Sequence, residues 1–177
     1  VYFAKNLENR AQTVTLLENS QSYSKIPLFL GVDEEGGTVS RLKTSGLAID
    51  TGVGTMQSIG ETADPAAAYA AGQEIAGNLH ALGFNLDFAP VADVSSGKNA
   101  AISSRSFGTD PELCASMAGI VSNALTDGGV IPCLKHFPGY GGAMADDHEG
   151  SVTVDKTLEE LESCDLIPYR RLLADQN

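Results

Sequence analysis

The residues best suited to proton transfer lie between Lys135 and His148. Lys135 and His136 close an apolar run with the composition of a strand, so they should point to opposite faces, one of them into the mouth of a sheet. A Gly- and Ala-rich loop then leads to Asp146 and His148. An Asp two residues before a His can accept one ring N–H, which fixes the tautomer and raises the basicity of the other nitrogen. The pattern predicts acid/base catalysis by His148, oriented by Asp146. A single His is usually structural, but two beside a Lys and a carboxylate favour a function.

A second polar group follows another apolar run, where Asp33, Glu34 and Glu35 precede paired glycines. Carboxylates at the end of a strand, next to glycines that let the backbone approach a ligand, suit the floor of a pocket. Arg41 is eight residues beyond Asp33 and could fold back to pair with it or to share a ligand. A solvated acidic turn with one surface ion pair is the alternative, and these residues by themselves favour neither.

Three further charged residues lie between these groups. Asp87 sits between large apolar residues, and a buried carboxylate needs partners or its pKa rises. We expect Asp87 to tie loops together at the rim of the sheet. Arg105 is interpreted either as a clamp for a ligand's carboxylate or hydroxyl groups, or as the partner of Asp87 or Asp93, and these readings are compatible.

Composition argues against several classes of protein. A net charge of −12 opposes binding to nucleic acid or to an anionic membrane surface. No apolar run approaches the ~20 residues that span a bilayer. The run Thr51–Gln57 lacks the third glycine of a dinucleotide-binding loop, and no P-loop motif occurs. The three cysteines are widely spaced, so we expect buried free thiols, no metal site and no cofactor.

The elements that must position these residues alternate between strand and helix. Strands are expected at Val1–Ala4, Leu28–Asp33, Phe84–Phe88 and Val130–Phe137. Four helices are expected. The first begins after a cap at Asn9 that pairs with Gln12, and the second runs from Asp64-Pro65 to Gly83. The third runs from a cap at Thr109 that pairs with Glu112 to Gly128, and the last begins after a cap at Thr157 that pairs with Glu160 and has a break or kink at Pro168. The long loops follow the strands, so function should lie at the carboxyl ends of a parallel sheet. Both a doubly wound sheet and a (β/α)8 barrel fit this pattern.

Taken together, four motifs resemble glycoside hydrolase family 3, specifically its β-N-acetylglucosaminidase branch. They are GVDEEGG followed by Arg41, NLDFAPVADV, RSFGTDPE, and KHFPG followed by Asp146 and His148. They occur in family order and cover essentially the whole chain. The resemblance implies an α/β fold that is a partial (β/α)8 TIM-like barrel, with about four strand–helix units present. Residues 1–177 would then be a truncated catalytic domain, since a full barrel needs ~250 residues.

The resemblance also implies roles for individual residues. Asp33, Arg41, Arg105, Lys135 and His136 would bind the hydroxyls of a terminal N-acetylhexosamine. Asp146 and His148 would be the acid/base pair of a retaining exo-β-N-acetylglucosaminidase that works by double displacement. The family's nucleophile is an Asp on a later strand that no position here matches, so the chain by itself is expected to be inactive.

Three positions depart from the common family pattern. Thr38 stands where an Arg is frequent, Tyr140 where a His is common, and Asp147 where a Ser is frequent. None of them removes a member of the acid/base pair. The extra charge of Asp147 should raise the pKa of His148.

Two other functions remain open beside the glycosidase. One is a non-catalytic sugar-binding or assembly fragment that needs a partner chain, and the other is a metal hydrolase built on Asp33, His136, Asp146 and His148 without an HExxH motif. Expected ligands are N-acetylglucosaminides, either peptidoglycan fragments or chito-oligosaccharides. Unpaired sheet edges predict self-association. Family members occur in the cytoplasm and outside the cell, so the resemblance implies no compartment.

Overall fold

The computed structural model describes residues 1–97, 100–143 and 153–174. Its centre is a parallel sheet of β1 (Gly31–Val32), β4 (Leu86–Asp87) and β5 (Ile131–Pro132), in the order β1-β4-β5. Tyr2 adds one parallel bridge to Val32 at the outer side of β1. The strands therefore lie side by side in sequence order, as in a barrel. In a doubly wound sheet the order reverses.

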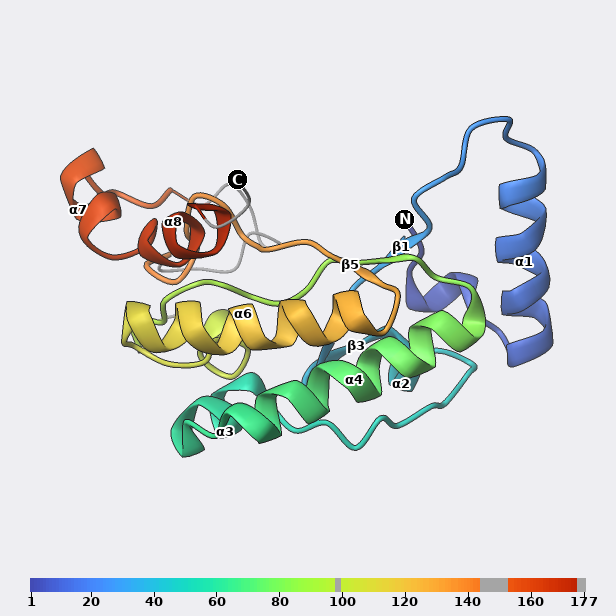
Figure 1. Cartoon of the computed structure of the whole chain (residues 1–177), viewed down its shortest axis with the longest axis horizontal. Helices are drawn as coiled ribbons and strands as arrows, with labels where there is room; N and C mark the ends of the chain where they lie inside the picture. The colour runs from blue at the N-terminus through green and yellow to red at the C-terminus, as the bar shows by residue number, and fades with distance from the viewer. Residues whose placement is uncertain (98–99, 144–152, 175–177) are drawn as a thin grey trace.

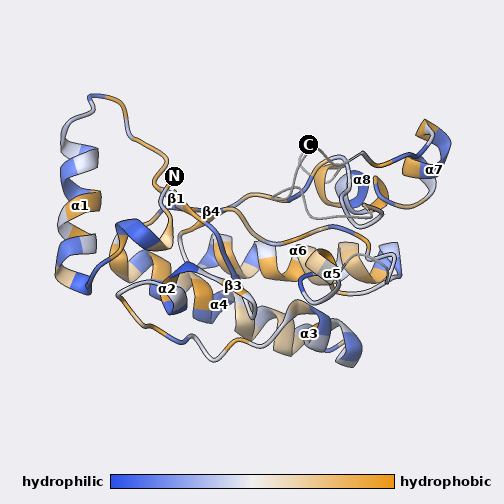
Figure 2. Cartoon of the chain, turned by 180° about the vertical axis from the view of Figure 1, so that it is seen from behind, coloured by the Kyte–Doolittle hydropathy of each residue, from blue (hydrophilic) through white to orange (hydrophobic). Residues whose placement is uncertain are grey.

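Among the described residues, the helices α4 (Pro65–Leu82) and α6 (Pro111–Asp127) cover one face of the sheet (Figure 1). Val32 and Asp87, which are register partners, are fully buried, whereas Ile131, the partner of Leu86, is 46% exposed. Helices α4 and α6 lie together beneath the strands. Both carry broad hydrophobic surfaces, whereas α1 is largely hydrophilic (Figure 2). The remaining elements are η1 (Ala4–Asn6), α1 (Arg10–Ser22), α2 (Arg41–Thr44), α3 (Met56–Thr62), α5 (Ala100–Ser103), α7 (Leu158–Ser163), α8 (Ile167–Ala174) and the hairpin β2 (Glu34–Gly36) with β3 (Val39–Ser40).

Helices α4 and α6 cross at a small-residue contact. A Cβ atom added to Gly72 would lie 2.6 Å from the Cβ of Ala124 and 3.0 Å from the carbonyl oxygen of Val121. Only a residue without a side chain lets the two backbones approach this closely. The crossing helps form the main core, which includes Ile75, Leu79 and Leu125.

Three of the four expected strands exist, but they are shorter than predicted. Each central strand has two paired residues, because the backbone leaves the regular ladder where the polar loops begin. The expected strand at Val1–Ala4 is reduced to the bridge at Tyr2, since η1 already begins at Ala4. The fold class is α/β, a partial TIM-like barrel, as the family resemblance implied.

Most predicted helix starts are correct, with one exception. Asn9, Asp64 and Thr157 accept hydrogen bonds from backbone N–H groups at the first turns of α1, α4 and α7. The cap at Thr109 was wrong: Asp110 caps α6, because its carboxylate accepts from Glu112 N at 2.9 Å. The break or kink expected at Pro168 is confirmed: α7 ends at Ser163 and α8 begins at Ile167, with Pro168 in its first turn, where its missing N–H costs nothing.

The three thiols are free. Cys114 is buried, as expected, and burial raises the pKa of its thiol to about 11. Cys133 and Cys164 are partly exposed, so the expectation of burial is wrong for these two. Within the described ranges, no helix has the length and apolar character that crossing a bilayer requires.

Candidate active site

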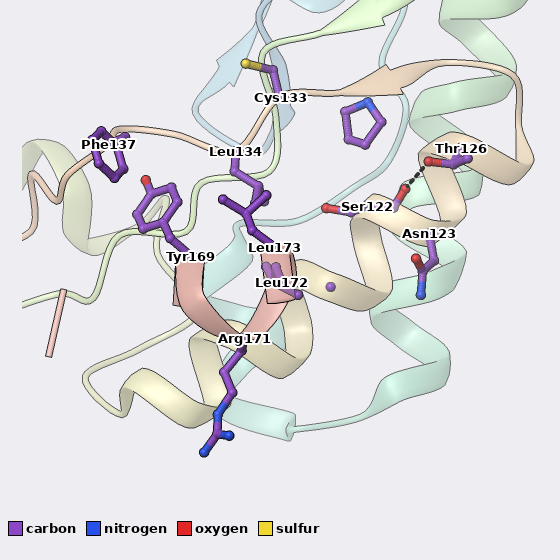
Figure 3. A pocket seen from close by; sticks show the side chains of 12 residues that line it. Ser122, Asn123, Thr126, Cys133, Leu134, Phe137, Tyr169, Arg171, Leu172 and Leu173 are labelled. Carbon is purple, nitrogen blue, oxygen red and sulfur yellow. Dashed lines mark hydrogen bonds between the residues drawn. The ribbon is translucent and has the colours of Figure 1, made fainter. Parts of the chain in front are cut away.

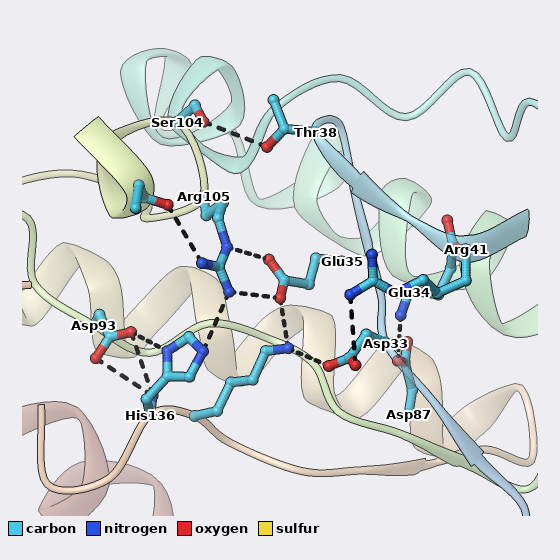
Figure 4. A network of polar contacts seen from close by, with 12 residues as sticks. Asp33, Glu34, Glu35, Thr38, Arg41, Asp87, Asp93, Ser104, Arg105 and His136 are labelled. Atoms are coloured by element: carbon cyan, nitrogen blue, oxygen red, sulfur yellow. Dashed lines mark hydrogen bonds and ion pairs between the residues drawn. The ribbon is translucent and has the colours of Figure 1, made fainter. Parts of the chain in front are cut away.

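Five polar side chains that the sequence singled out meet at the carboxyl ends of the strands (Figure 4). They are Asp33 after β1, Arg41 at the start of α2, Arg105 between α5 and α6, and Lys135 and His136 after β5. Residues as far apart as 33 and 135 are brought together because parallel strands end at the same edge of a sheet.

Asp33 lies between two cations. Its Oδ1 accepts from Lys135 Nζ at 2.6 Å, and its Oδ2 is 3.8 Å from the Nη2 of Arg41. Arg41 therefore folds back to Asp33, as the sequence allowed. The side chains of Asp33 and Arg41 keep 21% and 31% exposure, so both can reach a ligand.

Glu35 is the buried centre of the cluster. Its carboxylate receives two hydrogen bonds from Arg105, at 2.7 and 2.9 Å, and lies 2.5 Å from Lys135 Nζ. Only 2% of the Glu35 side chain is exposed. Burial by itself lowers the pKa of the Arg105 guanidinium, but the hydrogen bonds and charge of Glu35 outweigh it, and the pKa is raised.

This geometry corrects the expected partner of Arg105. Its carboxylate partner is Glu35, not Asp87 or Asp93, because the hairpin β2–β3 turns Glu35 toward the segment before α6. Sequence reasoning noted Glu35 in the acidic run but gave it no role. Its place in the acidic run was a signal that Glu34 shares, so it did not identify Glu35.

His136 is held by a different carboxylate. Its Nδ1 is 2.6 Å from Oδ2 of the fully buried Asp93, and its Nε2 is 3.2 Å from Nη2 of Arg105. Lys135 and His136 thus both reach the cluster, which corrects the expectation that they face opposite ways. The regular strand ends at Pro132, so strict alternation no longer applies at these positions.

Asp87 supports the cluster from below. Its Oδ1 accepts from Glu34 N at 2.9 Å, which ties β4 to the loop after β1, as expected. Asp87 is fully buried, and burial raises its pKa well above the ordinary value. Burial also raises the pKa of Glu34, whose Oε2 accepts from Leu42 N at 3.0 Å. A fully buried carboxyl group with a raised pKa is a poor nucleophile, because burial disfavours its charged form.

The expected acid/base pair, Asp146 and His148, lies outside the described residues, as does Asp147. Thr38, one of the departures from the family pattern, is at the rim of the cluster, with its hydroxyl 3.4 Å from that of Ser104 (Figure 4). Across the described ranges, no group of three or more His, Cys, Asp or Glu side chains is arranged to hold a metal ion.

A separate pocket of about 690 Å³ lies beside the outer edge of β5 (Figure 3). It is bounded by α6 and α8, and apolar groups of Leu134, Phe137 and Leu172 line much of it. None of the five converging residues lines it. Arg171 at its rim pairs with Glu112. This pocket is a groove at an uncovered strand and carries no catalytic arrangement.

Chemically, the cluster is suited to bind an uncharged, hydroxyl-rich ligand. Arg41, Arg105 and Lys135 supply hydrogen-bond donors, while Asp33 supplies acceptors. Arg105 and Lys135 are paired with Glu35 and Asp33, so the cluster presents donors and acceptors that are held in place.

The chain matches a known protein family along its whole length. The model of the glycosyl hydrolase family 3 N-terminal domain covers residues 1–177. A beta-hexosaminidase of Bordetella avium is 35% identical over 175 residues, which are 96% of this chain and 49% of that protein. Beta-hexosaminidase LpqI of Mycobacterium tuberculosis is 40% identical over 84% of this chain and 37% of its own length. The chain thus spans half or less of these relatives.

A solved structure has the same fold. NagZ from Neisseria gonorrhoeae, in complex with N-trifluoroacetyl-D-glucosamine, superposes with a TM-score of 0.90 at 32% identity, over 99% of this chain and 52% of that one. A family 3 β-N-acetylglucosaminidase from a Paenibacillus species gives a TM-score of 0.86 at 35% identity, over 98% of this chain and 33% of its own.

Proposed function

This chain belongs to the glycosyl hydrolase family 3 N-terminal domain family, and from that premise we propose that it forms the sugar-binding part of a β-N-acetylhexosaminidase. The convergence of five polar side chains at the carboxyl ends of the strands carries this proposal. Asp33, Arg41, Arg105, Lys135 and His136 bind the hydroxyls of a terminal N-acetylhexosamine. The relatives named beta-hexosaminidase, and the N-trifluoroacetyl-D-glucosamine bound to the gonococcal NagZ, support this ligand class.

The proposed reaction is hydrolysis with retention of configuration. His148 protonates the leaving oxygen and later activates water, while Asp146 orients its ring. The second carboxylate of a double displacement is not supplied by Asp87, which is fully buried and therefore out of reach of a ligand, nor by Asp33, which is committed to two cations. The 177 residues by themselves therefore bind sugar but turn it over poorly, since proton transfer contributes only about 10²–10⁴-fold.

Binding is tested by calorimetry with N-acetylglucosamine and the variant Arg41→Met. Arg41 is partly exposed and makes one long ion pair, so its loss should remove sugar contacts with little effect on folding. Affinity should fall about 10-fold or more, as expected for a hydrogen bond from a charged group. Lys43→Met is the matched control, because Lys43 pairs with Asp50 outside the cluster. Equal affinity of the Arg41→Met and Lys43→Met variants would contradict the proposal.

Turnover is tested with an aryl N-acetylglucosaminide. The chain is compared with a fusion to the remaining part of a relative's catalytic domain, each with and without His148→Ala. Activity in the fusion that depends on His148 supports the proposed roles. Robust activity of the 177-residue chain would place the nucleophile within it. Peptidoglycan fragments and chito-oligosaccharides are then compared as natural ligands.

The principal alternative is a non-catalytic sugar-binding fragment that associates with another chain. The uncovered face of the sheet supports association, since Phe29 and Ile131 are 71% and 46% exposed. We propose that the isolated chain self-associates through this face and the outer edge of β5. Sugar binding in the absence of any turnover, in the chain and in the fusion alike, would favour this alternative.

A further inference from the structure

The buried carboxylate of Asp93 has a full set of donors around it. Its Oδ1 accepts from Tyr140 N at 2.7 Å, and its Oδ2 lies 2.6 Å from His136 Nδ1. Both oxygens are 3.3 Å from the backbone N of His136. Asp93 is fully buried, so it cannot touch a ligand directly. It acts on the site only through the residues that it holds.

The two neighbours of the His136 ring fix where its proton sits. A carboxylate only accepts hydrogen bonds, so the nitrogen facing Asp93 must carry the hydrogen. A guanidinium only donates, so the nitrogen facing Arg105 must accept. His136 therefore has its hydrogen on Nδ1 and a lone pair on Nε2, 3.2 Å from Arg105 Nη2.

Arg105 cannot swing away to relax this constraint. Two hydrogen bonds to Glu35 and one to the carbonyl oxygen of Ala101, at 3.3 Å, hold its guanidinium. A hydrogen on Nε2 would therefore point at a fixed cation. On the other side of the ring, Tyr140 packs against His136 with the ring centroids 5.6 Å apart, which limits rotation.

We propose that Asp93 is a positioning residue that holds His136 as the neutral Nδ1–H tautomer, so that Nε2 is a hydrogen-bond acceptor among the donors of the site. The tautomer follows from the protein's own contacts, and only its effect on a ligand rests on the proposed sugar binding. Because Nε2 has one lone pair, a hydroxyl that donates to His136 replaces the Arg105 N–H there, and the displaced N–H donates to the hydroxyl oxygen, which orients the hydroxyl hydrogen. Asp33 and His136 are then the two acceptors that select how the sugar ring sits.

The tautomer is measured by ¹⁵N NMR of the ring nitrogens in the 177-residue chain at neutral pH. The sequence has three histidines, and His136→Gln assigns the relevant signals. The expected result is a protonated Nδ1 and an unprotonated Nε2. A protonated Nε2 in the unaltered chain would overturn the proposal, whatever any variant does.

The variant Asp93→Asn tests whether Asp93 sets this state. Its amide oxygen is needed by Tyr140 N, so its NH₂ group faces His136 Nδ1 and the hydrogen should move to Nε2. Affinity for N-acetylglucosamine should then fall about 10-fold or more. Ser106→Ala is the control, because Ser106 Oγ donates to the backbone oxygen of Asp93 at 2.7 Å without touching the carboxylate. It should lower stability and leave the tautomer unchanged.

The outcomes separate this inference from the proposed function. If the unaltered chain has the expected tautomer but binds no sugar, the role of Asp93 is supported and the proposed sugar binding is wrong. If the tautomer is unchanged in a folded Asp93→Asn chain, the proposed role of Asp93 is wrong, whether or not sugar binds.

Discussion

At the scale of single residues, the cluster depends on Glu35 more than on any residue that the sequence put forward. Its carboxylate joins Arg105 to Lys135 and is almost fully buried. Asp33 and Arg41 could be predicted from their spacing and from the likeness to family motifs. Glu35 could not be told from Glu34, because which of two adjacent carboxylates meets the cations depends on the twist of a three-residue strand.

Glu35→Gln should strongly destabilise the chain. It leaves two cations in a largely buried site without their shared carboxylate, which costs about 3 kcal/mol. The measurement is the free energy of unfolding in urea. Glu112→Gln is the matched control, because Glu112 binds Arg171 by two similar hydrogen bonds with both side chains more than half exposed. That change should cost less than about 1 kcal/mol. Equal losses would show that burial of the Glu35 pair does not matter.

The raised pKa of Asp87 predicts a dependence of stability on pH. Above the ordinary Asp pKa of about 4, the unfolded chain releases this proton while the folded chain keeps it. The folded state then binds more protons, so stability falls as pH rises toward the raised pKa. Asp87→Asn stays neutral and keeps an acceptor for Glu34 N. The variant's stability relative to the unaltered chain should therefore increase as pH rises above about 4.

Asp50→Asn should show the opposite trend. A hydrogen bond from Lys43 lowers the pKa of Asp50, so its contribution to stability is present above the ordinary pKa and is lost as pH falls. Relative stability of this variant should decrease as pH rises from below the lowered pKa of Asp50 to about 4, and should stay level at higher pH. Parallel curves for the two variants would contradict the assignment of a raised pKa to Asp87.

At the scale of elements, local signals located the helices better than the strands. The Asp64-Pro65 pattern gave the start of α4, and the same pattern at Asp110-Pro111 marks α6, where Thr109 was preferred instead. The short helices α2, α3 and α5 lacked a periodic apolar face long enough to predict. Strand lengths could not be read, because pairing depends on neighbours distant in sequence.

The crossing of α4 and α6 allows a comparison within one helix. Gly72→Ala should destabilise the chain by about 1–3 kcal/mol, since its Cβ would overlap Ala124. Gly77→Ala should stabilise it by about 0.5–1 kcal/mol, because no atom lies within 4 Å of the added Cβ and glycine is a poor helix former. Thermal unfolding followed by circular dichroism measures both. Stabilisation by both changes would mean that the helices are not packed as closely as described.

At the scale of the whole molecule, strand order decided what the alternation of elements left open. Doubly wound sheets and barrels share the same sequence period, so only the sequential neighbours β1, β4 and β5 distinguish them. The open face follows from this order. Helices protect one side of the sheet, while apolar residues at Phe29 and Ile131 face away from them.

Ile131→Lys should reduce the proposed self-association. A charge in the middle of the uncovered face must be desolvated when two such faces meet. Sedimentation velocity over a range of concentrations should show a shift from dimers or larger species toward monomer. Leu158→Lys is the control, because Leu158 is 67% exposed on α7, away from the sheet. If the unaltered chain is a monodisperse monomer, the proposed self-association is wrong.

The mutual pairing inside the cluster has a further consequence. Lys135 and Arg105 already hold their counter-charges as part of the protein, in Asp33 and Glu35. They therefore need few dissolved ions for neutralisation, and an uncharged ligand displaces almost none. The affinity of this site for a neutral ligand is consequently insensitive to ionic strength, so the site works equally well in dilute and in concentrated salt.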